Sequence, residues 1–123
     1  MEICTLGGFE EVGKNMTAVK IRDDVFIFDT GLFLPPVIEM QETEPQTQGQ
    51  AYSEQKLRKI GAIPDDLVLD KLGWKEKVRA IIIGHAHLDH IGGLQYIIHR
   101  YPNAQVIATP FTMAFFNVLL HDN

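Results

Sequence analysis

The sequence predicts an α/β (α+β) fold, with a mixed sheet and helices on one face. Three short strand-like runs come first, over residues 1–6, 16–22 and 25–28, whereas helical spacing of apolar residues dominates the last third of the chain. A strongly apolar β-branched run over residues 78–83 precedes that helical part. With 123 residues and 46% hydrophobic content, we expect residues 1–123 to belong to one domain with a core.

The first three strands are expected to form an antiparallel meander. In the second strand, residues 16–22, Lys20 and Arg22 face away from Val19 and Ile21, as in a half-buried strand. The third strand is continuously apolar, which is typical of a strand buried on both faces.

The middle of the chain shows little periodicity. Residues 35–51 follow neither a helical nor a strand period, and about residues 39–50, rich in Glu, Gln and Thr, are expected to form a mobile surface loop. Ser53 is suited to cap a short helix that ends at Gly61. Trp74 has no aromatic neighbour in sequence and is expected to pack in the core rather than stack on a base.

A helix is expected over residues 89–100, because apolar residues recur there at spacings of three and four. Gly92 and Gly93 fall in its first turn, where each glycine costs roughly 1 kcal/mol relative to alanine. Their missing side chains would let backbone N–H groups and the helix dipole approach a phosphate. The expected elements after it are a strand over residues 105–108 and a helix over residues 110–120.

The most specific feature is the run His85-Ala86-His87-Leu88-Asp89-His90, directly after the apolar strand. His85 and His87 alternate off the strand end and can reach one metal ion, while Asp89 and His90 lie where the chain turns and can reach a second. Imidazole suits zinc, and carboxylate oxygens also accept manganese. A polar loop of surface histidines is the alternative, but three histidines and a carboxylate at this spacing favour a metal site.

Four segments of the chain resemble ribonuclease J, and most of all its archaeal form. They are residues 7–17, 28–31, 85–93 and 108–112. The His-x-His-x-Asp-His pattern resembles the signature of the metallo-β-lactamase fold, which implies an αββα sandwich of two similar halves. By this resemblance the chain is the amino-terminal part of such a domain. The second half, and the β-CASP domain that the family inserts into it, are expected outside these residues.

The resemblance implies two divalent metal ions bridged by a hydroxide, zinc with manganese as the alternative. His85 and His87 would hold the first ion. Asp89 and His90, the expected catalytic residues, would hold the second. Asp29 would lie beneath the metal loop and fix it by hydrogen bonds, the other reading being a turn-initiating carboxylate. The family's remaining ligands, a bridging aspartate and two histidines, are expected outside this chain.

The implied activity is metal-dependent hydrolysis of RNA, chiefly from its 5′ end, in a cytoplasmic enzyme of RNA processing and decay. A net charge of −5 provides no general attraction to phosphates, so RNA binding would depend on the metals and on a basic groove from elsewhere. The single cysteine, Cys4, cannot form an internal disulfide, which fits a reducing cytoplasm. No apolar run approaches the ~18 residues of a membrane span.

By itself the chain is expected to be inactive, because two protein ligands per metal rarely hold zinc firmly. The apolar face that the second half would cover is expected to drive a homodimer. Two other functions stay open: another metallo-β-lactamase hydrolase, acting on thioesters or lactams, and a non-catalytic interaction module. Lys14 and Asn15 stay open between ordinary turn chemistry and a role near the substrate.

Overall fold

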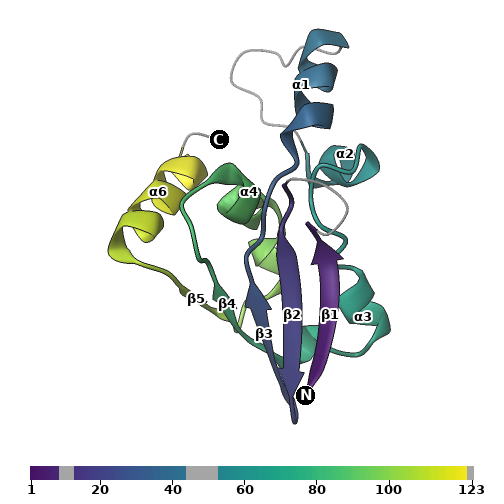
Figure 1. Ribbon diagram of the computed structural model, residues 1–123, viewed down its shortest axis with the longest axis vertical. Helices are drawn as coiled ribbons and strands as arrows, with labels where there is room; N and C mark the ends of the chain where they lie inside the picture. The colour runs from purple at the N-terminus through teal and green to yellow at the C-terminus, as the bar shows by residue number, and fades with distance from the viewer. Residues whose placement is uncertain (9–12, 44–52, 122–123) are drawn as a thin grey trace.

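One five-stranded mixed sheet organises the part of the chain that the computed structural model describes, residues 1–8, 13–43 and 53–121 (Figure 1). Its strands, in spatial as well as sequence order, are β1 (Glu2–Gly7), β2 (Met16–Ile21), β3 (Asp24–Phe28), β4 (Val78–Ile82) and β5 (Gln105–Ile107). The first three pair antiparallel, and β4 and β5 continue the sheet in parallel. The predicted fold class and the predicted meander are confirmed.

The helices and the core lie against one face of this sheet. The helices are α1 (Leu34–Thr43), α2 (Glu54–Lys59), α3 (Val68–Lys71), α4 (Leu88–Ile91), α5 (Leu94–Ile97) and α6 (Pro110–His121), with 3₁₀ turns η1 (Lys75–Lys77) and η2 (Ile98–Arg100). Ala18, Ile27 and Ile81 are neighbours across three strands, and all are fully buried in one core with Leu94 and Ile97. Trp74 is also buried there, as predicted.

The other face of the sheet is apolar and open to solvent. Ile21 and Ile107 are exposed, and Phe28 at the end of β3 is 42% exposed. The prediction that the third strand is buried on both faces is therefore wrong. The alternation predicted for β2 is present, but its buried side carries Met16 and Ala18 instead of Val19 and Ile21.

The segment after β3 is more regular than expected. α1 forms with Val37 and Met40, three residues apart, turned into the protein. Pro35 and Pro36 fall in its first turn, where the backbone N–H groups have no helical partner in any case. The prediction that residues 35–51 have no helical period is therefore wrong for residues 35–43, which lie in α1. The rest of the expected mobile loop lies outside the described residues.

The short helix α2 begins and ends as the sequence predicts. The Ser53 hydroxyl accepts a hydrogen bond from the Lys56 N–H at 3.1 Å, and Gly61 follows the helix with a φ of 76° that favours glycine. The four-residue α3 has no such signal and was not predicted.

The helix predicted over residues 89–100 is broken into α4, α5 and η2. The Gly93 N–H donates to the Thr30 carbonyl at 2.8 Å, rather than to the Asp89 carbonyl four residues earlier, so the helical ladder stops there. A Cβ atom on Gly93 would lie 2.5 Å from the Gly31 carbonyl oxygen. Glycine is needed here because two backbones approach closely.

The exchange Gly93→Ala tests this break by the sign of its effect. In a continuous helix, alanine would stabilise by about 1 kcal/mol. Here the added Cβ meets a backbone oxygen, so we expect the free energy of unfolding in urea to fall by about 2 kcal/mol or more. Gly84→Ala is the matched control, because the nearest atom to its Cβ would lie 3.6 Å away. A stabilised Gly93→Ala variant would contradict the described packing.

A buried ion network joins α2 and η2 to the segment before α3. Asp66 is fully buried, with the Arg58 Nη1 atom 2.7 Å from one carboxylate oxygen and the Arg100 Nε atom 2.8 Å from the other. The Tyr101 hydroxyl donates to Asp66 at 2.6 Å, and its burial, reinforced by the Asp66 charge, raises the pKa of this tyrosine. A hydrogen bond from Arg100 holds the pKa of Asp70 below its usual value. Both arginines thus pair with carboxylates of the same chain.

Candidate metal centre

The histidine cluster spans the loop after β4 and the one-turn helix α4. It lies at the end of the sheet where β3 and β4 both finish (Figure 1). Because these two strands are parallel neighbours, the residue that follows β3 lies beside the residues that follow β4. That residue is Asp29, whose N–H donates to the Ile82 carbonyl at 2.8 Å. Sheet topology alone thus brings Asp29 to the loop that carries the histidines.

Asp29 is bonded to the loop through both carboxylate oxygens. Oδ1 accepts from the Gly84 N–H at 2.9 Å, and Oδ2 lies 2.9 Å from His90 Nδ1. Its φ of 66° is in the left-handed region, which residues other than glycine enter rarely. A carboxylate opposite Nδ1 favours the tautomer with the proton on that nitrogen, and this leaves the His90 Nε2 lone pair for a metal ion.

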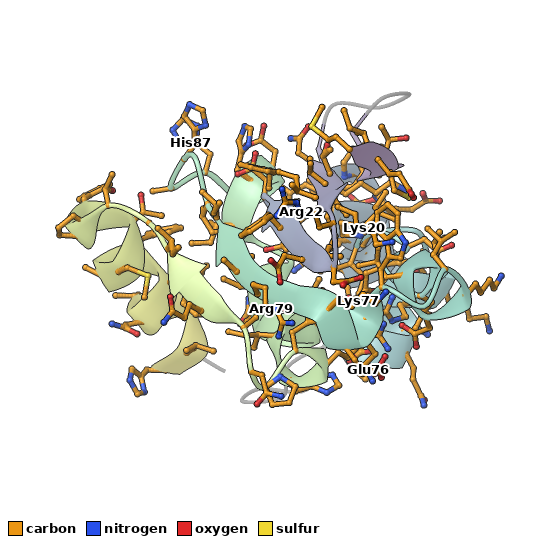
Figure 2. The ribbon with its side chains drawn as sticks, turned by 90° about the horizontal axis from the view of Figure 1, so that it is seen from below. Lys20, Arg22, Glu76, Lys77, Arg79 and His87 are labelled. Atoms are coloured by element: carbon orange, nitrogen blue, oxygen red, sulfur yellow. The ribbon has the colours of Figure 1, made fainter. Side chains whose placement is uncertain are left out.

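Of the four predicted ligands, His85 and His87 lie on this loop, and Asp89 and His90 lie in the one-turn helix α4 that follows it. The ring centroids of His85 and His90 are 4.6 Å apart, and those of His85 and His87 are 6.1 Å apart. His90 Nε2 lies 3.4 Å from Asp89 Oδ2. His85 and His87 are exposed, and Figure 2 shows His87 projecting away from the ribbon. Asp89 and His90 form the tighter pair.

The side chains fit a divalent metal ion in kind but not in number. Three imidazoles and a carboxylate are suitable zinc and manganese ligands. Among the described residues, however, no group of three or more His, Cys, Asp or Glu side chains is placed so that it could hold one ion. The side chains of the described residues therefore do not by themselves complete a site for one ion.

An open hollow of about 500 Å³ lies against the loop. Its lining residues are Leu32, Leu34, Pro35, Ala86, His87, Leu88, Asp89 and Phe115. These come from the loop and α4, from α1 and the segment just before it, and from α6. His87 and Asp89 thus face an accessible and largely apolar space.

Gly92 and Gly93 have a different role from the one expected. The Gly92 N–H donates to the Leu88 carbonyl at 2.9 Å, the Gly93 N–H donates to Thr30, and both glycines are buried. With both donors used inside the chain, the interpretation that they face a phosphate is wrong. A Cβ on Gly92 would lie 2.7 Å from that of Leu32, so close packing explains this glycine too.

Basic side chains gather at the other end of β4. Lys20, Arg22, Lys77 and Arg79 lie where β2 ends and β4 begins (Figure 2). Arg79 Nε is paired with Asp24 Oδ1 at 2.8 Å. The length of β4, roughly 17 Å for five residues, separates this cluster from the histidine loop.

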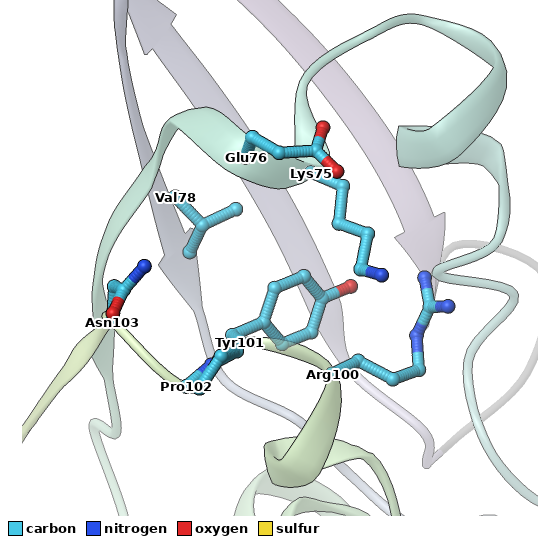
Figure 3. Close-up of a pocket in the computed structure, with 7 residues that line it drawn as sticks. All are labelled: Lys75, Glu76, Val78, Arg100, Tyr101, Pro102 and Asn103. Carbon is cyan, nitrogen blue, oxygen red and sulfur yellow. The ribbon is translucent and has the colours of Figure 1, made fainter.

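A cavity of about 170 Å³ lies at that same distant end (Figure 3). It is lined by Lys75, Glu76, Val78, Arg100, Tyr101, Pro102 and Asn103. Its arginine and tyrosine already bind the Asp66 carboxylate. The cavity is therefore a feature of the structural ion network and takes no part in the candidate centre.

The family model described as "Metallo-beta-lactamase superfamily" matches residues 10–122, which is most of the chain. This chain belongs to the metallo-β-lactamase superfamily. Within that superfamily it is similar to proteins named ribonuclease J. That of Pyrococcus abyssi is 43% identical over 113 residues, which is 92% of this chain and 23% of that protein. That of Methanocaldococcus jannaschii is 40% identical over 113 residues, again 92% of this chain and 24% of that protein.

A bacterial ribonuclease J, from Thermus thermophilus, is 30% identical over 102 residues, covering 80% of this chain and 14% of that protein. The predicted resemblance to ribonuclease J, in particular its archaeal form, is confirmed. The chain spans about a quarter of the length of the two archaeal relatives. No helix among the described residues is long and apolar enough to cross a membrane.

The exchange Asp29→Asn tests the support that this residue gives to the metal ligands. Asparagine tolerates a positive φ, so the fold is retained, but its amide cannot accept from both Gly84 and His90. We expect manganese affinity, measured by titration calorimetry, to fall about tenfold. Asp24→Asn is the control, since that carboxylate pairs with Arg79 at the far end. Equal affinities in the two variants would show that Asp29 does not support the ligands.

Proposed function

We propose that this chain contributes metal-binding and catalytic residues to a metal-dependent ribonuclease of the ribonuclease J type. The proposed reaction is 5′–3′ exoribonuclease-like hydrolysis of RNA phosphodiesters, in cytoplasmic RNA processing and decay. The main support is the Asp29 carboxylate, which holds His90 at Nδ1 beside Asp89, on a chain 43% identical to an archaeal ribonuclease J. The molecule that the protein binds in this proposal is RNA, held by its 5′ end.

In this proposal His85 and His87 hold one divalent ion, and Asp89 and His90 hold the second. Two divalent ions, zinc or alternatively manganese, would lower the pKa of a shared water and stabilise charge on the reacting phosphate. The chain's own residues orient the ligands. Asp29 keeps a proton on His90 Nδ1, which directs the Nε2 lone pair outwards and makes it a stronger donor.

We further propose that these residues form the amino-terminal part of a metallo-β-lactamase domain. The incomplete ligand set and the one-quarter coverage of the archaeal relatives support this. Further ligands would then come from outside the chain. Taken alone, the 123 residues are expected to bind metal weakly and to leave RNA undegraded, because each ion has too few ligands.

A chimera that supplies the missing part of the enzyme allows the proposed function to be tested although the chain itself is incomplete. Residues 10–122 would replace the matching segment of the Pyrococcus abyssi ribonuclease J, which is 43% identical. We expect the chimera to degrade 5′-monophosphorylated RNA in the presence of zinc or manganese. The same chimera with His87→Ala is expected to lose at least about 100-fold in rate, because one metal loses a ligand.

The alternatives predict other results from the same proteins. A metallo-β-lactamase hydrolase of another class would leave RNA intact and hydrolyse a thioester or a β-lactam. An interaction module would fold in the chimera and show neither activity. Either outcome would refute the proposed ribonuclease function. RNA digestion by the isolated chain, abolished by His87→Ala, would refute its proposed incompleteness.

We also propose that the isolated chain forms a homodimer through the open face of the sheet. Ile21 and Ile107 are each 48% exposed on this face, and Phe28 is 42% exposed. Phe28 and Ile107 are in register on either side of Ile82 in β4, whereas Ile21 lies at the other end of β2. A second copy offers a matching apolar face of the same sheet, and two sheets can pack face to face about 10 Å apart. This arrangement buries side chains that a monomer leaves in water.

The mass in solution tests the dimer. Light scattering on the 123-residue chain is expected to give twice the chain mass, and Phe28→Lys should convert it to a monomer by placing a charge in the apolar face. Lys20→Ala, on the buried side of the neighbouring strand, is the control and should remain dimeric. A monomeric wild-type chain at high concentration would contradict the dimer.

A further inference from the structure

Asn15 holds the backbone of the residue that carries the candidate catalytic carboxylate. Its side-chain Nδ2 donates to the Asp89 carbonyl oxygen at 2.7 Å, and its backbone N–H donates to the same oxygen at 3.1 Å. The two residues are 74 positions apart in sequence. An asparagine that only shapes a turn bonds its own backbone about two residues on. Asn15 instead makes a tertiary contact.

The backbone around Asn15 is closely packed. The Asn15 carbonyl accepts from the Gly31 N–H at 2.9 Å. A Cβ on Gly31 would lie 2.6 Å from the Asn15 nitrogen, and a Cβ on Gly8 would lie 3.1 Å from its side-chain Cγ. Glycines on both sides thus allow the asparagine to reach the loop.

The one-turn helix α4 cannot hold Asp89 by its own ladder. The donor that would bond the Asp89 carbonyl in a longer helix is the Gly93 N–H, and it is bonded to Thr30. The two N–H groups of Asn15 take its place. The Asp89 side chain is attached to the Cα atom next to that carbonyl. The contact with Asn15 therefore fixes the position from which the carboxylate extends.

We propose that Asn15 is a positioning residue for the metal centre, which fixes Asp89 beside His90 through the Asp89 carbonyl. In its metal-related part this inference rests on the proposed function. Asn15 itself touches neither metal nor substrate in this proposal. It acts through the backbone of Asp89, which carries one of the ligands.

Two measurements on the 123-residue chain test the inference. Amide hydrogen exchange, followed by NMR without metal, reports how firmly the backbone around the loop is held. Asn15→Ala is expected to raise exchange at Gly31 and Leu32 about tenfold, the effect of one lost hydrogen bond, and to leave the amides of β3 unchanged. Zinc affinity, measured by competition with a chromogenic chelator, is expected to fall about tenfold. Asn103→Ala, at an exposed asparagine of the distant cavity, should alter neither.

A double-mutant cycle distinguishes positioning from general support of the fold. Asp89→Ala removes the carboxylate but keeps the backbone carbonyl that Asn15 holds. Adding Asn15→Ala to this variant should again raise local exchange, without weakening zinc binding further. An equal loss of zinc affinity in both backgrounds, or faster exchange spread over the whole sheet, would overturn the inference.

The same data separate this inference from the proposed function. If the isolated wild-type chain binds no zinc, the exchange data alone decide the role of Asn15, and the chimera decides the proposed function. Unchanged exchange at Gly31 and Leu32 in Asn15→Ala would overturn the inference even if zinc binds.

Discussion

The candidate site depends on hydrogen bonds between two backbones that are far apart in sequence. The Thr30 N–H donates to the His90 carbonyl at 2.8 Å, and the Leu32 N–H donates to the Leu88 carbonyl at 2.8 Å. With Asn15 bound to the intervening carbonyl of Asp89, three consecutive carbonyls are held from outside the loop. These contacts accompany the end of the helix after one turn. The His90 imidazole lies against Asp29, and Asp89 lines the open hollow.

Much of this fold could be predicted because its signals are local. Alternation revealed the strands, and Ser53 revealed the start of α2. The break after α4 could not be predicted, because the partner of Gly93 is Thr30, which is 63 positions earlier, and periodicity reports only near neighbours. The bond from Asn15 to Asp89 is invisible for the same reason.

The alternating pattern also could not predict which side of β2 is buried. Met16 and Ala18 on one side and Val19 and Ile21 on the other are all apolar, so either side could have met the helices. In the described structure one side is covered and the other is open. The same ambiguity has a functional meaning here, because a sheet that is apolar on both faces is suited to a fold with a second layer.

The central claim is that the loop from His85 to His90 binds a divalent metal ion, and manganese broadening of histidine NMR signals tests it directly. Substoichiometric Mn²⁺ added to the metal-free chain should broaden the imidazole signals of His85, His87 and His90. His99, which is paired with Glu54, and His121 at the end of α6 provide internal references. Selective broadening of the three loop histidines is the predicted result. Equal broadening of all five histidines, or none, would contradict a metal centre at this loop.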